Sequence, residues 1–318
     1  MSACCLCQWA GYAALGYILI RVFNILHETF YPFLFARPIR DLVSYSGGTW
    51  AVITGATDGI GKQYAIQLAA RGFNVAIVGR NAQKLQHTAD EIKEATPNSE
   101  VKQIVFDFAD ADVDSYEQNV ASRLEELDIG VLVNNVGTSY EYPDTLDQVP
   151  VAVANATVVV NTVSATMLSR FVLPTMLARN KGVIVTVGSA AGAFTPAPML
   201  SVYSGTKAFV DFFMRSLMGE FASKNVFIQV VHPFFVCTKM SGMKRASFFA
   251  PSPETYAKSA IDTIGIQRRT FGCLAHAIQG AVISLMLPLL PERVLNAVAY
   301  RQMNTIKQRS LKRKQKAN

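Results

Sequence analysis

Charged residues are scarce in this 318-residue chain: Asp, Glu, Lys and Arg make up 17% of it, while 50% is hydrophobic. A mean hydropathy of +0.22 is high for an ordinary cytosolic protein and indicates contact with a membrane. The formal charge of +7 arises at the C-terminus, because residues 301–318 hold seven of the 30 basic residues and no acid. The other 23 basic residues balance the 23 acidic ones. Without a basic face or groove, nucleic-acid binding is not expected.

Cysteine is also scarce. Three of the five cysteines (Cys4, Cys5 and Cys7) lie in the first seven residues, and Cys237 and Cys273 are isolated. This spacing provides neither a metal site with histidine partners nor a disulfide framework, so we expect no metal and a reducing compartment. The N-terminal cluster is compatible with palmitoylation beside a membrane segment, and equally with chance clustering.

The N-terminal stretch from Leu6 to Ala36 is mostly apolar, and it carries no charge up to Ile20. A bilayer core of about 30 Å needs roughly 20 apolar residues, so Leu6–Ile20 is too short to span it unless Arg21 snorkels to the interface and Val22–Leu26 contributes. We expect a membrane anchor, with an amphipathic interfacial helix as the alternative; a cleaved signal peptide is disfavoured because no basic segment precedes the run. Arg37 and Arg40 follow it, which places the bulk of the protein in the cytosol.

A second apolar stretch runs from Gly272 to Pro291. Pro288 and Pro291 argue against one regular spanning helix, which leaves a membrane hairpin, a monotopic helix or an element that covers substrate. The final residues place Lys314 and Lys316 fifth and third from the C-terminus. That pair resembles the dilysine signal for retrieval to the endoplasmic reticulum, which requires a cytosolic tail.

Strand-like and helix-like segments alternate over residues 45–265, with no internal repeat and no long linker. The strand-like runs are rich in Val and Ile without polar alternation, which is typical of parallel strands buried on both faces. We therefore expect an α/β fold, a doubly wound parallel sheet in a single Rossmann-type domain, with ligands at the carboxyl ends of the strands. The expected strands are Thr49–Thr54, Asn74–Val78, Val101–Phe106, Ile129–Asn134, Val183–Val187 and Phe227–His232. The expected helices are Ile60–Arg71, Ala82–Ala95, Asp112–Leu127, Ala152–Ala178 and Ser201–Ser223.

A glycine-rich loop follows the first expected strand. Its sequence is Thr54-Gly55-Ala56-Thr57-Asp58-Gly59-Ile60-Gly61, and a helical pattern follows it. Glycines allow the backbone to approach a pyrophosphate, and the N-terminus of a helix attracts its charge. The loop therefore predicts a dinucleotide site, although glycines that serve only the turn are the alternative.

Polar residues also follow the next three expected strands. Arg80 and Asn81 follow the second strand, where a guanidinium favours the 2′-phosphate of NADP, although a solvated arginine that opens a helix is the alternative. Asp107 follows the third and could accept from an adenine amino group or cap a helix. Asn134, Asn135, Val136 and Gly137 follow the fourth, where they could form the floor of a cofactor site or a simple turn.

The fifth expected strand leads to Ser189, and 14 residues later Tyr203 opens a helix that also carries Lys207. Positions i and i+4 share a helix face. An ammonium group there stabilises a phenolate and lowers the tyrosine pKa towards the working range, and a serine hydroxyl could donate to a carbonyl oxygen. The three residues predict an acid/base site for carbonyl chemistry.

Together these motifs resemble the short-chain dehydrogenase/reductase family over residues 48 to about 240. The resemblance implies that Tyr203 is the acid/base and that Ser189 polarises the substrate carbonyl, so that both bind substrate. Lys207 would lower the pKa of Tyr203 and hold the nicotinamide ribose. Asn161 matches the amide that carries a proton-relay water. One departure is a Ser189–Tyr203 interval one residue longer than usual, which puts Ala190 at the usual spacing; Ser189 is retained because alanine has no donor.

The segment after the sixth expected strand, residues 233–238, belongs to the same resemblance. It implies that Pro233, Val236 and Thr238 bind the cofactor, with Thr238 on the nicotinamide carboxamide. With the residues above, the implied NADP site comprises Gly55, Thr57, Asp58, Gly59, Ile60, Gly61, Arg80, Asn81, Asp107, Asn134, Val136, Gly137, Tyr203, Lys207, Pro233, Val236 and Thr238.

Two longer segments, Asn134–Pro143 and Pro251–Ala260, also resemble the subfamily of very-long-chain 3-oxoacyl-CoA reductases, which are also described as type 12 17β-hydroxysteroid dehydrogenases. The resemblance implies an enzyme of the endoplasmic reticulum membrane, facing the cytosol, that uses NADPH to reduce long-chain 3-oxoacyl-CoA in fatty-acid elongation beside other elongation enzymes. The alternatives are a steroid 17-ketoreductase and a catalytically silent NADP-binding scaffold. The sequence does not predict the oligomeric state.

These features divide the chain into four parts. We expect an N-terminal membrane-anchor region over residues 1–44 and an NADP-binding catalytic domain over 45–268. An apolar segment, membrane-associated or substrate-covering, follows over 269–300, and a basic cytosolic tail over 301–318.

Overall fold

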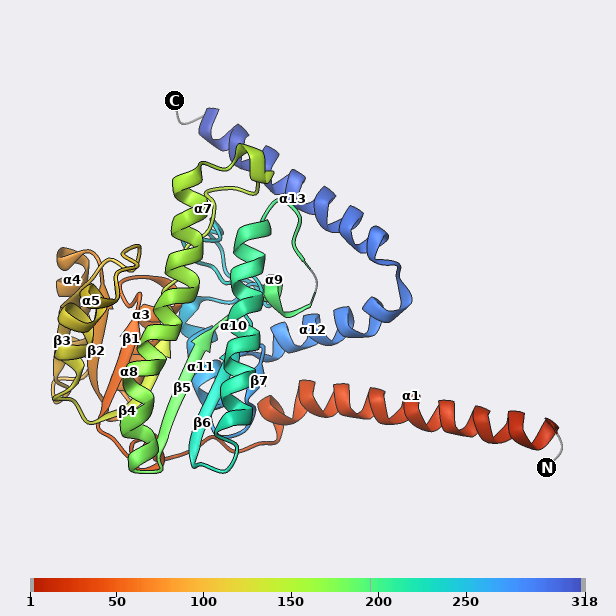
Figure 1. Ribbon diagram of the computed structural model, residues 1–318, viewed down its shortest axis with the longest axis horizontal. Coiled ribbons are helices and arrows are strands. Elements are labelled where there is room, and N and C mark those ends of the chain that lie inside the picture. The colour runs from red at the N-terminus through yellow and green to blue at the C-terminus, as the bar shows by residue number, and fades with distance from the viewer. Residues whose placement is uncertain (1–2, 195, 316–318) are drawn as a thin grey trace.

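The computed structural model describes residues 3–194 and 196–315, with side chains from Gln8 onward. Its centre is a parallel sheet of seven strands in the order β3-β2-β1-β4-β5-β6-β7, with helices on both faces (Figure 1). The predicted doubly wound α/β fold is confirmed. The strands are β1 Trp50–Thr54, β2 Asn74–Gly79, β3 Val101–Val105, β4 Ile129–Asn134, β5 Gly182–Val187, β6 Val226–Val231 and β7 Arg269–Thr270.

The helices fill the connections between strands and extend the chain at both ends. The α-helices are α1 Ala3–Leu34, α2 Leu42–Ser46, α3 Gly59–Ala69, α4 Ala82–Ala95, α5 Val113–Tyr116, α6 Ser122–Leu124, α7 Val151–Val158, α8 Ser164–Ala178, α9 Ala190–Ala193, α10 Ser201–Glu220, α11 Pro253–Asp262, α12 Leu274–Met286 and α13 Glu292–Gln315. Single turns of other helix types are η1 Glu117–Ala121, η2 Leu146–Gln148, η3 Val159–Val163 and η4 Leu287–Leu289.

Alternate residues of each central strand enter two hydrophobic cores, one on each face of the sheet. In β1, Ala51 and Ile53 face the core that α3, α4 and α11 cover, while Val52 faces the core under α8 and α10. Both faces are buried, which explains why the strands read as continuous apolar runs. The topology reverses between β1 and β4, so their carboxyl ends open the crevice in which such folds bind ligands.

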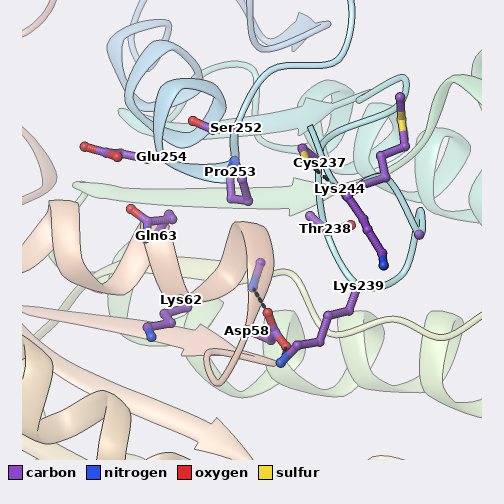
Figure 2. A pocket seen from close by; sticks show the side chains of 13 residues that line it. Asp58, Lys62, Gln63, Cys237, Thr238, Lys239, Lys244, Ser252, Pro253 and Glu254 are labelled. Atoms are coloured by element: carbon purple, nitrogen blue, oxygen red, sulfur yellow. Dashed lines mark hydrogen bonds and ion pairs between the residues drawn. The ribbon is translucent and has the colours of Figure 1, made fainter. Parts of the chain in front are cut away.

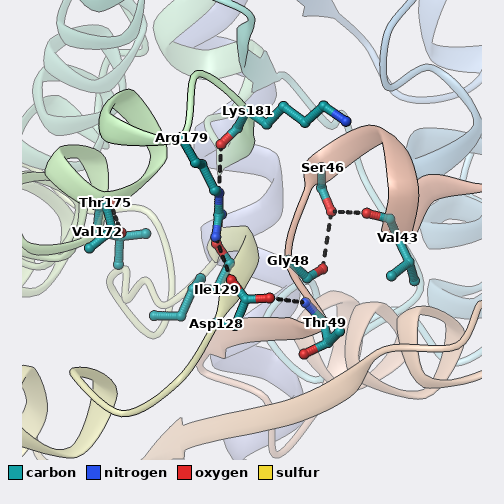
Figure 3. A network of polar contacts seen from close by, with 10 residues as sticks. All are labelled: Val43, Ser46, Gly48, Thr49, Asp128, Ile129, Val172, Thr175, Arg179 and Lys181. Carbon is teal, nitrogen blue, oxygen red and sulfur yellow. Dashed lines mark hydrogen bonds and ion pairs between the residues drawn. The ribbon is translucent and has the colours of Figure 1, made fainter.

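Polar contacts link the segments at the amino ends of the strands, on the side of the sheet opposite to that crevice (Figure 3). Arg179, at the end of α8, pairs with Asp128 at 2.7 Å and donates to the carbonyl oxygens of Lys181 and Ile129. Asp128 also accepts from the backbone N–H of Thr49 at 3.2 Å. The contacts tie α8 to the starts of β1 and β4, so the amino ends of these strands have a structural role.

The apolar segment α7-η3-α8, residues 151–178, is long enough to cross a membrane by length and composition, but a third of its most apolar window is buried inside the protein. Leu168, Val172 and Met176 of this segment lie in the core beside β4 and β5. Its hydrophobicity is therefore explained by packing on the sheet.

Helix α1 differs from that segment because no residue of its most apolar window is buried. It projects from the body of the protein and lies beside α12 (Figure 1). Gln267 anchors its C-terminal end by donating to the carbonyl oxygen of Glu28 at 3.2 Å. The span of Gln8–Leu34, 27 residues, makes α1 a candidate membrane anchor because it exceeds the roughly 20 residues that a bilayer requires. The side chains of Cys4, Cys5 and Cys7 lie outside the described residues.

The C-terminal part forms two helices with a sharp bend between them at η4 (Figure 1). Helix α13 then runs back over the domain, where Lys307 pairs with Asp144 at 2.5 Å and Lys314 with Glu141 at 2.6 Å. The basic segment expected as a tail from residue 301 is thus part of a helix that contacts the loop after β4. Lys316 of the dilysine pair lies outside the described residues.

Candidate active site

The glycine loop joins β1 to α3 at the carboxyl edge of the sheet. Gly55 and Gly59 have φ values of +64° and +56°, in the left-handed region that favours glycine. A Cβ atom on Gly61 would overlap the Asn135 amide and the carbonyl oxygen of Gly55. The loop can therefore close only with glycine at these positions, which leaves its backbone open to a ligand.

The first turn of α3 follows directly. Asp58 caps the helix by accepting from the backbone N–H of Gly59 at 2.8 Å. Its other carboxylate oxygen pairs with Lys239 at 2.6 Å, across the mouth of a pocket (Figure 2). Thr57 and Ile60 lie half-buried in the same loop. The N-terminus of a helix beside a glycine loop is an arrangement that binds phosphate groups.

Asn135 holds the glycine loop in place. Its amide donates to the carbonyl oxygens of Thr54 at 2.9 Å and Gly55 at 3.2 Å. Thr54 in turn accepts from the backbone N–H groups of Asn135 and Val136 with its hydroxyl, both at 3.0 Å. The sequence placed Asn135 in the turn that could form the floor of the site, but the implied NADP site did not include it; the Asn-Asn-Val-Gly turn was the signal for its role.

The neighbouring Asn134 is turned into the core instead. Its amide donates to Ser169 at 3.0 Å and to Thr186 at 3.3 Å, and the residue is only 4% exposed. Asn134 therefore ties β4 to α8 and β5, and its side chain is engaged away from the glycine loop.

Gly137 lies where the turn after β4 meets the long helices. A Cβ atom there would lie 3.3 Å from Oδ1 of Asn161 and 3.4 Å from Nζ of Lys207. Asn161, in η3, accepts from the N–H of Thr138 at 2.8 Å and donates to its carbonyl oxygen and to Thr206, both at 3.0 Å. The structure brings Asn161 close to Lys207, and its relay role stays a prediction.

Tyr203 and Lys207 share one face of α10, and Nζ of Lys207 lies 5.9 Å from the centroid of the Tyr203 ring. Lys207 donates to the carbonyl oxygen of Val187 at 2.9 Å, at the end of β5. Ser189 follows, and its hydroxyl oxygen accepts from the N–H of Ala191 at 3.2 Å, which leaves the hydroxyl proton to donate. The three predicted catalytic residues lie together at the carboxyl ends of β5 and the start of α10.

The predicted pKa of Tyr203 is wrong in direction. Burial raises the pKa of Tyr203 above its ordinary value, and the hydrogen bond with Ser189 only partly offsets this. Burial also lowers the pKa of Lys207 to about 8. Sequence reasoning counted the ammonium group and omitted the cost of burying a phenolate. A raised pKa keeps Tyr203 protonated at neutral pH, which is the form that donates a proton.

The residues expected at the adenosine end are exposed. Arg80 follows β2, and it forms no hydrogen bond or ion pair with the described residues. Asn81 caps α4 by accepting from the N–H of Lys84 at 2.9 Å. Asp107 follows β3 and accepts from the N–H of Ala109 at 3.1 Å. The Arg80 guanidinium is thus available to a phosphate, while Asn81 and Asp107 also serve the local backbone.

The segment after β6 reaches the glycine loop from the other side. Thr238 lies 3.2 Å from where a Cβ atom of Gly59 would be, Pro233 accepts from the N–H of Ala190 at 2.9 Å, and Val236 is buried. A pocket of about 680 Å³ opens between this segment and α3 (Figure 2). Its lining residues are Asp58, Gly59, Lys62, Gln63, Cys237, Thr238, Lys239, Gly242, Met243, Lys244, Ser252, Pro253 and Glu254.

These features fit a dinucleotide that lies across the carboxyl edge of the sheet. The glycine loop keeps its closed shape only because Gly61 has no side chain, and Gly137 leaves the space next to Lys207 and Asn161 free of a side chain of its own. Ser189 and Tyr203 then face the end of that crevice, where a hydride acceptor would lie. The arrangement is suited to transfer of a hydride and a proton to a carbonyl group.

Comparison with known proteins agrees with this geometry. The short chain dehydrogenase family model matches residues 49–247. The chain is 44% identical to a very-long-chain 3-oxoacyl-CoA reductase of Caenorhabditis briggsae, over 93% of both chains. It is 46% identical to a very-long-chain 3-oxoacyl-CoA reductase of Anas platyrhynchos, over 85% of this chain and 84% of the relative.

Among solved structures, a short-chain dehydrogenase from Sphingobium yanoikuyae in complex with NADPH is 26% identical. It matches with a TM-score of 0.63 over 74% of this chain and 94% of its own. The family model covers more than half of this chain, and the order of the motifs agrees with it. The protein is a member of the short-chain dehydrogenase/reductase family.

Proposed function

We propose that the protein reduces long-chain 3-oxoacyl-CoA to 3-hydroxyacyl-CoA with NADPH, as a step of fatty-acid elongation. The observation that carries the proposal is the convergence of Ser189, Tyr203 and Lys207 beside the glycine loop, in a chain 46% identical to a reductase of that name. Contact with other elongation enzymes remains an expectation from the same resemblance.

The roles of the three residues follow from their positions. When bound, NADPH would supply the hydride for the carbonyl carbon. Ser189 donates a hydrogen bond to the carbonyl oxygen, which stabilises the negative charge that develops there. Tyr203 passes its phenolic proton to that oxygen, and the ammonium group of Lys207 stabilises the phenolate that remains. The product is an alcohol, and Tyr203 regains a proton before the next turnover.

The acyl-CoA substrate is tested by NADPH oxidation with the purified full chain in lipid nanodiscs. We expect turnover of 3-oxoacyl-CoA substrates, with an optimum at long chains. Turnover of estrone without turnover of any 3-oxoacyl-CoA would favour the steroid ketoreductase instead. NADPH binding without reduction of either substrate would identify a silent scaffold.

We further propose that NADP is preferred over NAD because Arg80 pairs with the 2′-phosphate. Arg80→Ala removes a charge-assisted hydrogen bond of about 1.5–3 kcal/mol, so the KM for NADPH should rise by about 10- to 160-fold. The KM for NADH, which lacks the phosphate, should stay unchanged.

Arg123→Ala is the matched control for this prediction, because Arg123 is an exposed arginine on α6. It should leave both KM values unchanged. An equal rise of both KM values in Arg80→Ala would show that Arg80 does not read the phosphate.

The membrane association of the protein is proposed from its two ends. Helix α1 would anchor the chain in the endoplasmic reticulum membrane, with the catalytic domain in the cytosol, where the dilysine pair would be read. Residues 282–291, which we call the elbow, lead from the end of α12 to α13, and α12 contacts α1. The exposed fractions of its large apolar side chains are 78% for Leu289, 51% for Val282, 49% for Met286 and 44% for Leu285. An exposed apolar patch of this kind beside an unburied apolar helix fits the same bilayer.

A tryptophan at Leu289 tests the elbow. In a full chain that also carries Trp9→Phe and Trp50→Phe, Leu289→Trp should give blue-shifted fluorescence in phosphatidylcholine vesicles, and brominated lipids should quench it. The physical reason is that Leu289 would lie among acyl chains, which exclude water and bring bromine into contact with the indole.

Val105→Trp in the same background is the control, because Val105 is 54% exposed on β3 at the far edge of the sheet. Its emission should resemble that of a tryptophan in water. Emission of Leu289→Trp that matches the control places the elbow in water, and a blue shift without quenching means that protein covers it. Either result contradicts the proposal.

A further inference from the structure

A buried carboxylate lies on the catalytic face of α10 and has no place in the reaction described above. Tyr203, Lys207 and Asp211 are spaced at i, i+4 and i+8, so they follow one another along one face of the helix. Asp211 is only 3% exposed. A buried carboxylate is costly unless several donors compensate it, so its partners show what it does.

Two of these partners come from the last two strands of the sheet, β6 and β7. His232, at the end of β6, lies with its Nε2 atom 2.9 Å from Asp211. Arg269, in β7, donates to both carboxylate oxygens, from Nε at 2.9 Å and from a terminal nitrogen at 3.3 Å. Arg215, at 3.5 Å, is more distant and lies at the surface. Asp211 thus joins α10 to β6 and β7.

Both partners also reach the segment that carries Ser189. The His232 ring packs against Gly188, where a Cβ atom would lie 2.7 Å from Nδ1. Arg269 donates to the carbonyl oxygen of Ala193 at 3.0 Å. These contacts lie at the two ends of the short turn α9, which begins at its cap residue, Ser189.

The turn has little room to move between these contacts. A Cβ atom on Gly192 would overlap the backbone of Lys207 and Ala208, so α9 lies directly against α10. The N–H of Ala190 is bonded to Pro233 at 2.9 Å. The distance between the hydroxyls of Ser189 and Tyr203 therefore depends on how α9 sits on α10.

The charges in this cluster favour a stable contact between an ionised Asp211 and a neutral His232. Burial raises the pKa of Asp211, but the hydrogen bonds from His232 and Arg269 outweigh it and hold the pKa well below its usual range. Burial lowers the pKa of His232, which keeps its ring neutral at neutral pH. The ring then donates to Asp211 from Nε2 and presents an unprotonated Nδ1 to Gly188.

We propose that Asp211 is a positioning residue, which holds Ser189 at the correct distance from Tyr203 through His232 and Arg269. The inference rests on the proposed reduction of a carbonyl group, because it assigns the cluster to that reaction. The alternative is that the cluster of Asp211, His232 and Arg269 only stabilises the domain. The two readings differ in whether the effect of Asp211 depends on Ser189.

A double-mutant cycle separates them. Asp211→Asn keeps the shape of the side chain and removes its charge. With 3-oxoacyl-CoA as substrate we expect kcat to fall by about 10- to 100-fold, since a misplacement of about 1 Å can cost roughly 100-fold. The dissociation constant of NADPH should not change. In a Ser189→Ala chain, the same substitution should lower kcat by less than about threefold, because residues that act as a unit are not additive.

Arg269→Gln repeats the cycle if Asp211→Asn does not fold, because Arg269 is 41% exposed and its loss frees the Ala193 carbonyl oxygen. Asp262→Asn is the control, since it breaks an ion pair of Asp262 with Arg71, in the turn after α3, and should leave kcat unchanged in both backgrounds. An equal loss of kcat in the wild-type and Ser189→Ala backgrounds overturns the inference. A loss of kcat that is accompanied by a rise in the dissociation constant of NADPH also overturns it. A wild-type chain that reduces neither 3-oxoacyl-CoA nor estrone contradicts the proposed function instead.

Discussion

Tyr203→Phe is expected to lower kcat for reduction of 3-oxoacyl-CoA by about 10³- to 10⁴-fold. The substitution removes one oxygen atom and leaves the ring in place. General acid catalysis contributes about 10²- to 10⁴-fold in enzymes, and Tyr203 is the one group that transfers a proton to the carbonyl oxygen in the proposed reaction. The expected loss therefore lies at the upper end of that range.

The loss should appear in kcat and leave the dissociation constant of NADPH within about twofold, because the glycine loop that binds the pyrophosphate is untouched. Single-turnover measurements of NADPH oxidation, with cofactor binding followed by fluorescence, check both values. Tyr45→Phe is the control, since Tyr45 lies in α2, away from the carboxyl edge of the sheet; it should keep full activity. Undiminished NADPH oxidation by Tyr203→Phe would remove Tyr203 from the mechanism.

The sequence was informative wherever one chemical requirement determined a local pattern. The Val- and Ile-rich runs predicted six of the seven strands because strands buried on both faces admit few polar residues. The glycine loop and the Tyr203–Lys207 spacing could be recognised in the sequence for the same reason. Strand β7 was missed because Arg269 and Thr270 are too few to form a pattern.

Properties that depend on contacts between distant segments could not be predicted from the sequence. The raised pKa of Tyr203 comes from burial, which spacing along one helix does not reveal. The packing of α13 over the loop after β4 depends on pairs such as Lys307–Asp144, more than 160 residues apart. Asp211 likewise belongs to no sequence motif, and only the fold places it against His232 and Arg269.

The second large effect is expected at the glycine loop, where Gly61→Ala should strongly weaken NADPH binding. A Cβ atom at this position overlaps the Asn135 amide and the carbonyl oxygen of Gly55. One of these is backbone, so neither a rotamer change nor a small shift of a side chain removes the clash. The loop must open, and the bonds from Asn135 to Thr54 and Gly55 must break. We expect the dissociation constant of NADPH to rise by at least about 100-fold, which corresponds to about 2.7 kcal/mol.

The measurement is the thermal shift that NADPH produces, with the melting temperature of the free protein as the fold control. Gly219→Ala is the matched substitution, since Gly219 lies inside α10 and no atom is within 4 Å of its Cβ position. Alanine at that site should stabilise the chain by about 0.5–1 kcal/mol, because glycine is unfavourable inside a helix, and NADPH should bind as before. If Gly61→Ala folds and retains the full NADPH shift, the cofactor does not lie on this loop. A lost shift in a folded Gly61→Ala chain, beside an intact one in Gly219→Ala, would instead locate the pyrophosphate at the turn between β1 and α3.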